Sequence, residues 1–214
     1  MKLVIGNKNY SSWSLRAWLA LAATGADFEE IVIPLDTPDT KAEIARHTGS
    51  GRVPVLLDDG VTVWDSLAII EYLAERYPEA GLWSPDPTIR AHQRCICAEM
   101  HSGFAALRAY YPMNIRRNVD NRPATAEVQT EIDRICFLWR EALEDSSGEG
   151  PYLFGGFSAE DAMFAPVVSR FETYGVPVGD LERGYMDAIL TNPLFERWAQ
   201  AAKQETWTIE TEEV

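Results

Sequence analysis

The stretch KLVIGNKNYSSWSLRAWLALAATG, residues 2–25, indicates how the chain begins to fold. Its opening KLVIG is typical of a strand, and SLRAWLALAATG repeats apolar residues at helical spacing up to Gly25. FEEIVIPL, residues 28–35, predicts a second strand. A strand, a helix and a strand in this order imply a right-handed crossover between two parallel strands.

The next segments complete a small mixed domain. VPVLLDD (residues 53–59) and VTVWD (residues 61–65) predict two antiparallel strands joined by a tight turn at Asp59-Gly60, and residues 66–78 predict a helix. Apolar residues then recur at three- and four-residue spacing, which indicates helical structure over residues 88–111 and 125–144. We therefore expect an α/β domain over residues 1–78, a proline-rich linker over 79–87 and an all-helical domain over 88–214.

Composition excludes several classes of partner. A formal net charge of -14 argues against nucleic acid, because phosphate backbones are bound by Lys and Arg. The apolar N-terminal stretch is too short for a signal-peptide core, and no apolar segment approaches the roughly 20 residues that span a bilayer. We therefore expect a cytoplasmic protein that binds no membrane. Three cysteines, an odd count without a paired framework, predict free thiols.

Two weaker motifs are interpreted as structural. His92, Cys95, Cys97 and His101 are all potential metal ligands. A helix advances by about 100° per residue, so the first pair lies nearly opposite the second, and we expect no metal site. TGSGR, residues 48–52, leads into a strand rather than a helix, and therefore predicts a chain reversal rather than a phosphate-binding loop.

A turn between the first strand and the first helix contains three serines, Ser11, Ser12 and Ser14, and is called the serine turn below. Ligands of open α/β sheets bind at this place in the fold. Ser14 is the expected N-cap or first-turn residue of the helix. Ser11 and Ser12 then remain free to donate hydrogen bonds to an anionic group over the positive helix end. In the alternative interpretation, all three hydroxyls satisfy backbone groups of the turn. A nucleophilic serine is not expected, because the sequence has no G-x-S-x-G elbow.

Two further turns offer polar groups to a ligand. Pro54 stands at the entrance of an apolar strand, and a cis Val53-Pro54 bond would leave the Val53 backbone free to pair with a peptide. Asp65 and Ser66 open a helix whose amides and hydroxyl would hold a carboxylate, while Asp65 would hold an ammonium group. The alternative for this second turn is helix capping alone. Together the three turns predict a site for a zwitterionic peptide.

These motifs resemble the N-terminal, thioredoxin-like domain of the glutathione transferases. The resemblance rests on YSSWSLR (residues 10–16), Val53-Pro54 and DSLAIIEYL (residues 65–73), and it extends over the whole chain. It implies a thioredoxin-like α/β domain followed by an all-α helical bundle. The pattern S-S-x-S-x-R after the first strand is most similar to the zeta (maleylacetoacetate isomerase) class and its bacterial relatives.

A segment of the helical half also resembles the family. In FSAEDAMFAPVVSRF, residues 157–171, Ser158 is the expected N-cap of a core helix and Asp161 its capping-box partner. Glu160 stands where alanine is common in the family. We expect Glu160 to be exposed and this difference to matter little.

The resemblance implies roles for the residues of a glutathione site. Ser11 matches the serine that donates a hydrogen bond to the glutathione sulfur, and Ser12 is the alternative donor. Trp13 stands where zeta enzymes carry a cysteine. This difference departs from the isomerase pattern and places a bulky ring beside the expected binding site of the second substrate. The other implied contacts are the Val53 backbone with the cysteinyl part, Pro54 as the cis-proline, Asp65 and Ser66 at the γ-glutamyl end, and Arg52 at the glycine carboxylate.

The resemblance also implies a pocket for a second substrate, between the serine turn and the first long helix of the bundle. Its candidate residues are Trp13, Met100, Phe104, Arg108 and Tyr111. The implied protein is a homodimeric glutathione S-transferase of detoxification, which activates the thiol of its co-substrate glutathione for attack on a hydrophobic electrophile. A glutathione-dependent cis-trans isomerase and a non-catalytic binding or adaptor member of the fold are the alternatives. Thiol-disulfide chemistry is not supported, because the serine turn contains no cysteine.

Overall fold

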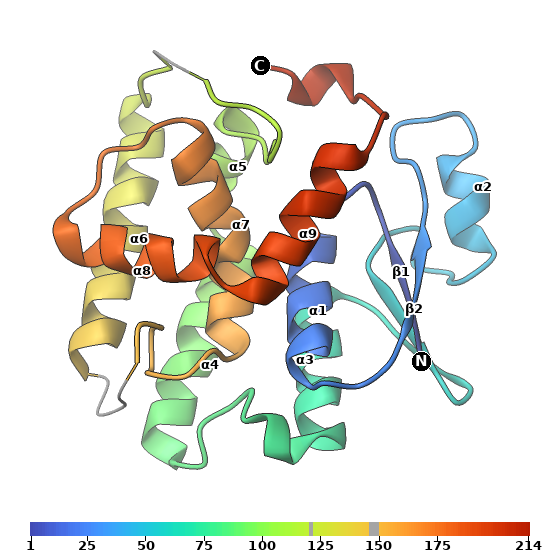
Figure 1. Ribbon diagram of the computed structural model, residues 1–214, viewed down its shortest axis with the longest axis horizontal. Coiled ribbons are helices and arrows are strands. Elements are labelled where there is room, and N and C mark those ends of the chain that lie inside the picture. The colour runs from blue at the N-terminus through green and yellow to red at the C-terminus, as the bar shows by residue number, and fades with distance from the viewer. Residues whose placement is uncertain (120–121, 146–149) are drawn as a thin grey trace.

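In the computed structural model, which describes residues 1–119, 122–145 and 150–214, a sheet of four strands lies beside a larger group of helices (Figure 1). The strand order is β2-β1-β3-β4. The elements of this first part of the chain are β1 (Lys2–Ile5), α1 (Ser12–Ala23), β2 (Glu29–Val32), α2 (Thr40–Ala45), β3 (Val55–Asp58), β4 (Val61–Val63), α3 (Ser66–Arg76) and a 3₁₀ turn, η1 (Pro78–Ala80).

Strand pairing follows the predicted pattern. β1 runs parallel to β2, with Val4 opposite Ile31, which confirms the predicted crossover. β3 runs antiparallel to both β1 and β4. Asp59 and Gly60 join β3 to β4 with φ values of 44° and 87°. Two-residue hairpin loops favour positive φ at both positions, so the predicted tight turn is confirmed.

The two faces of the sheet bury different side chains, because successive residues of a strand point to opposite sides. Leu3 and Ile5 of β1 belong to the main core with residues of α1 and α3. Val4 instead packs in a smaller cluster with Ile44 of α2, which lies across the sheet from α1 and α3 (Figure 1). The sequence interpretation missed α2, because a helix of six residues is too short to show a periodic pattern.

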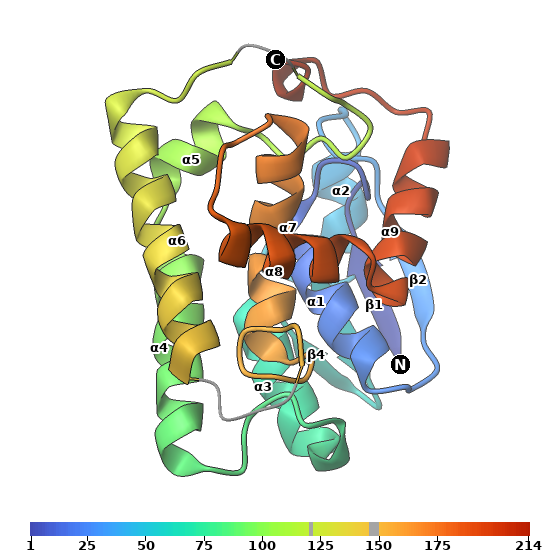
Figure 2. The ribbon, with the colours of Figure 1, turned by 60° about the vertical axis from the view of Figure 1, so that its left-hand side comes forward.

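Helices make up the second part of the described chain. They are α4 (Pro87–Ser102), α5 (Ala105–Tyr110), α6 (Ala126–Asp145), α7 (Ala159–Thr173), α8 (Asp180–Leu190), α9 (Pro193–Gln204) and η2 (Glu210–Glu212). α7 is central and packs against α1, α4 and α8 (Figure 2). The helical segment predicted over residues 88–111 is divided into α4 and α5, because Phe104 adopts a left-handed φ of 58°. Over the described ranges, every helix is too short or too polar to cross a bilayer.

The start of α7 confirms one expectation and corrects another. The Asp161 carboxylate accepts a 2.9 Å hydrogen bond from the Ser158 N–H, which confirms the capping box. Glu160 is fully buried rather than exposed, because this end of α7 packs against α4. Glu160 Oε1 accepts hydrogen bonds from Gln93 Nε2 at 2.9 Å and from the Ser158 hydroxyl at 2.6 Å. Burial raises the pKa of the Glu160 carboxyl to about 7.

Candidate functional site

The serine turn lies at the start of α1, shortly after β1 ends. The helix begins at Ser12, so Ser11 occupies the N-cap position and Ser14 the first turn. The Ser11 hydroxyl donates a 2.7 Å hydrogen bond to Ser14 Oγ, which also accepts the Gly6 N–H at 3.0 Å. Ser14 therefore supports the turn. The Ser12 hydroxyl makes no hydrogen bond to any residue that the structure describes, and it lies at a helix end whose first amides lack intrahelical partners.

The C-terminal part of the chain holds the loop that precedes the serine turn. Glu205, just after α9, accepts hydrogen bonds from the backbone N–H groups of Lys8 at 2.7 Å and Asn9 at 3.0 Å. Trp198 of α9 donates from Nε1 to the Lys8 carbonyl at 2.9 Å. Sequence reasoning missed these supports, since no local pattern connects residues 190 or more positions apart.

Val53 and Pro54 lie directly before β3. The Val53-Pro54 peptide bond is cis, as the family resemblance implied. Val53 lies outside the ladder between β1 and β3, which begins at Val55. An extended peptide can pair with such a backbone segment through main-chain hydrogen bonds.

The start of α3 supplies an acidic group and a hydroxyl. Asp65 Oδ1 accepts hydrogen bonds from the Leu67 N–H at 2.9 Å and the Ala68 N–H at 3.4 Å, so Asp65 caps the helix. Ser66 is 1% exposed, and its hydroxyl has no partner among the described residues. A buried hydroxyl without a partner costs free energy, and a bound polar ligand can relieve that cost.

These groups meet in a cavity of about 630 Å³. The predicted site residues that line it are Trp13, Arg52, Val53, Pro54, Asp65 and Ser66. Asp65 is the only carboxylate among the described lining residues, and Arg52 contributes a cation. Ser11 and Ser12 do not line this cavity; they are 7% and 6% exposed and directly precede Trp13, which does. The Asp65 carboxylate, the Arg52 guanidinium, and the hydroxyl and backbone N–H of Ser66 suit a zwitterionic ligand.

His101 belongs to this site although the sequence predicted an ordinary helix histidine. It lies in the last turn of α4, and its Nε2 is 2.9 Å from Asp65 Oδ2. Its ring packs edge-on against Trp13, with centroids 5.2 Å apart. One signal in the sequence could have placed His101 in this site. It directly follows Met100, on the helix expected to border the pocket for the second substrate.

Two arginines flank Trp13. The Arg108 guanidinium lies 5.5 Å from the Trp13 ring centroid, and that of buried Arg16 lies 4.4 Å away. Arg16 Nε donates to the Met163 carbonyl at 3.0 Å, while its two terminal nitrogens have no partner among the described residues. Burial, together with the charges of Arg170 and Arg108, lowers the pKa of Arg16 to about 9.

The other residues predicted for the acceptor pocket lie in the core. Met100 is fully buried, and Phe104 and Tyr111 are buried as well. The Tyr111 ring stacks on Tyr174 with centroids 4.3 Å apart. None of the three lines the cavity that contains Trp13, so their contact with a second substrate stays a prediction.

The cysteines and the remaining histidine of α4 are dispersed. The Cys97 thiol is buried, and burial together with Glu160 and Asp161 raises its pKa. Cys95 is exposed, and His92 packs against Phe154. In the part of the chain that the structure describes, no three His, Cys, Asp or Glu side chains are grouped to hold a metal ion.

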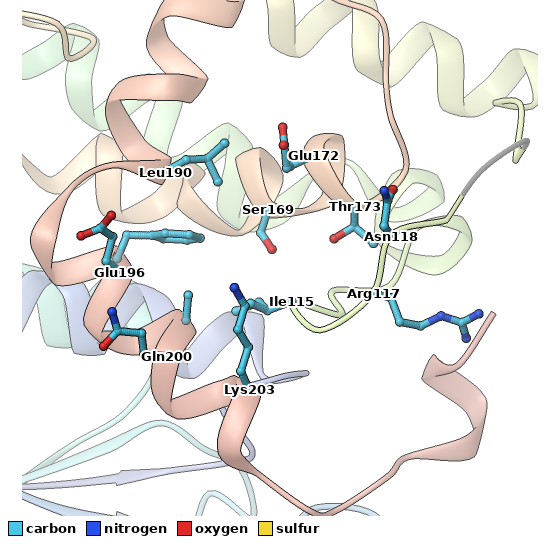
Figure 3. A pocket seen from close by; sticks show the side chains of 12 residues that line it. Ile115, Arg117, Asn118, Ser169, Glu172, Thr173, Leu190, Glu196, Gln200 and Lys203 are labelled. Carbon is cyan, nitrogen blue, oxygen red and sulfur yellow. The ribbon is translucent and has the colours of Figure 1, made fainter.

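A second cavity, of about 400 Å³, lies between α7, α8 and α9 (Figure 3). Ser169 and Glu172 of α7 and Lys203 of α9 are among its lining residues. Glu172 is already paired with Arg183 at 2.8 Å. None of the predicted site residues lines this cavity, so it is separate from the site around Asp65.

Comparison with known proteins finds relatives over most of the chain. Residues 10–76 match the family described as glutathione S-transferase, N-terminal domain. The chain is 39% identical over 193 residues to glutathione S-transferase Z1 of Arabidopsis thaliana, covering 83% of this chain and 85% of that protein. It is 38% identical over 170 residues to the maleylacetoacetate isomerase of Mus musculus, covering 78% and 76%. A bacterial zeta-class maleyl pyruvate isomerase shares its fold, with a TM-score of 0.75 and 23% identity over 97% of this chain and all of that one.

Proposed function

The chain belongs to the glutathione S-transferase family, and we propose that it binds glutathione and activates the glutathione thiol for attack on a hydrophobic electrophile. The observation that carries this proposal is the cavity beside α3. There Asp65 faces the α-ammonium, while the hydroxyl and the backbone N–H of Ser66 hold the α-carboxylate. The Val53 backbone pairs with the cysteinyl part, and Arg52 attracts the glycine carboxylate.

Activation means stabilising the thiolate. A cysteine-like thiol titrates near ~8.5 in water, so little of it is ionised at neutral pH. The N-terminus of α1 and a serine hydroxyl both favour the anion, and a depression of about two units corresponds to roughly 2.7 kcal/mol. The serine stays protonated as a donor, and the thiol proton passes to solvent. The sulfur then forms a bond to an electrophilic carbon, from which a leaving group departs with its electron pair.

Ser11 and Ser12 differ in how readily they donate. The Ser12 hydroxyl is unpaired among the described residues, whereas that of Ser11 already donates to Ser14 and must rotate to reach a sulfur. Both remain candidates for the donor. The experiment below separates them.

Isomerisation is the second candidate function, and the arginines beside Trp13 favour it. Arg108 beside Trp13 and the positive charge of buried Arg16, whose terminal nitrogens have no partner among the described residues, suit an acidic second substrate. In this reaction the thiolate adds to a carbon–carbon double bond, the resulting single bond rotates, and the thiolate is expelled again. Relatives named maleylacetoacetate isomerase support it. Trp13 in place of the zeta-class cysteine argues for the transferase.

The proposal includes the organisation of the protein. Residues 1–78 form the glutathione-binding domain, residues 79–87 the linker and residues 88–214 the helical domain. The chain pairs as a homodimer, as is expected for the family, and acts in the cytoplasm on a small electrophile in detoxification. It requires no metal.

The testing experiment is an ultraviolet titration of the glutathione thiolate bound to wild-type, Ser11→Ala and Ser12→Ala proteins. Wild type should show bound thiolate at neutral pH, and the substitution of the donor serine should abolish it without unfolding the protein. Glutathione bound with an unshifted thiol pKa in all three proteins would point to a non-catalytic binding member. Glutathione that does not bind at all would overturn the proposed site.

A further inference from the structure

Asp65 uses its two carboxylate oxygens for different purposes. Oδ1 accepts the amides of Leu67 and Ala68, and Oδ2 faces His101 Nε2 at 2.9 Å. A carboxylate has about four lone-pair sites, so Oδ2 can contact His101 and still receive a ligand's ammonium group. Held at both oxygens, the carboxylate keeps one plane and one direction.

Because of the charges around the cavity, binding of an ammonium group there depends on the Asp65 carboxylate. Asp65 is the only acid among the described residues that line the cavity. Arg52 lines the same cavity, and Arg16 and Arg108 lie over Trp13. These cations attract the carboxylates of glutathione and repel its ammonium. Favourable binding of the ammonium therefore depends on where the Asp65 carboxylate points.

His101 is itself held in place. Its side chain is 27% exposed, its ring packs edge-on against Trp13, and it occupies the last turn of α4, where the helix dipole favours an N–H donor or a positive group. An imidazole fixed in this way has a smaller entropy cost for its contact with Asp65 than a freely rotating side chain.

We propose that His101 is a positioning residue for the glutamyl end of glutathione. Through the 2.9 Å contact between its Nε2 and Asp65 Oδ2, it holds the carboxylate in the orientation that receives the α-ammonium. This inference rests on the proposed function, since it concerns the same ligand and the same cavity. His101 also packs on Trp13, which is a candidate residue of the pocket for the second substrate. It therefore connects the glutathione site with that pocket.

The test measures binding by calorimetry to the full-length chain, with glutathione and with a glutathione analogue that lacks the α-amino group. His101→Leu should bind glutathione about 10-fold more weakly than wild type, which corresponds to roughly 1.4 kcal/mol, and should bind the analogue equally well. His101→Gln keeps an N–H donor and should recover most of the loss. Thermal unfolding of each variant checks that the fold is retained.

A double variant tests whether His101 acts through Asp65. Combining Asp65→Asn with His101→Leu should weaken glutathione binding by less than the sum of the two single losses, and about as much as Asp65→Asn alone. Fully additive losses, equal losses for both ligands in His101→Leu, or no recovery in His101→Gln would each overturn the inference. Wild-type protein that binds neither ligand would instead contradict the proposed function.

Discussion

The Ser11 hydroxyl donates a 2.7 Å hydrogen bond to Ser14 Oγ, and Ser14 in turn accepts the N–H of Gly6. The two hydroxyls thus join the chain just after β1 to the first turn of α1. The three serines of this turn are therefore not equivalent. Ser14 supports the backbone, Ser11 is bonded to Ser14, and Ser12 is unpaired among the described residues.

Replacing Ser14 should destabilise the fold. Ser14→Ala removes the acceptor of a buried N–H, which costs about 1–3 kcal/mol of unfolding free energy. Ser12→Ala removes no hydrogen bond to a described residue and should change that free energy by less than about 0.5 kcal/mol. Urea denaturation of both variants measures the difference, and equal losses would contradict the assignment.

Asp65→Asn should weaken glutathione binding without weakening the helix. Asparagine caps a helix about as well as aspartate, so the melting temperature should stay near that of wild type. Loss of a charged acceptor costs about 1.5–3 kcal/mol, or about 10- to 150-fold in affinity. Calorimetric titration checks this. Asp59→Asn, in the exposed β3–β4 turn, is the matched control and should bind normally.

Glu160→Gln should reduce the dependence of stability on pH. The pKa of Glu160 is about 7 in the fold, above the ordinary value near ~4.3, so the unfolded chain releases this proton first. Wild-type stability should therefore fall as pH rises from about 4.3 to about 7, by at most about 4 kcal/mol, and then level off. Glutamine reproduces the neutral form and removes this contribution.

Urea unfolding of wild type and Glu160→Gln at several pH values across this window tests the prediction. Glu172→Gln is the control, because Glu172 is exposed on the same helix. An unchanged slope in Glu160→Gln would show that the buried carboxyl does not carry the effect.

Glu205→Ala should disturb the serine turn from the far end of the chain. It leaves the backbone N–H groups of Lys8 and Asn9 without their acceptor, which costs about 1–3 kcal/mol of stability. Glutathione turnover should fall together with stability, because Lys8 and Asn9 lie in the loop that leads into Ser11. Glu210→Ala, in the exposed part of the same tail, serves as the control. Equal behaviour of the two variants, in denaturation and in turnover, would contradict this role.

Local signals in the sequence predicted much of the fold. Asp59-Gly60 predicted the hairpin, because only a two-residue turn with positive φ connects strands so closely. The Ser158–Asp161 capping box and the Asp65 cap were also predictable, since each joins groups within a few residues. The short α2 was missed because it has no periodic face.

The sequence by itself determined the four strands, the helices α1 and α3 that pack on them, and the motifs that line the cavity, because these depend on turn geometry, capping and periodicity within short windows. Tertiary structure alone decided that Glu160 is buried, that His101 meets Asp65 and that Glu205 supports the serine turn. Each of these contacts joins separate elements, and hydrophobic packing, which brings the elements together, is non-directional and leaves no local pattern for such partners.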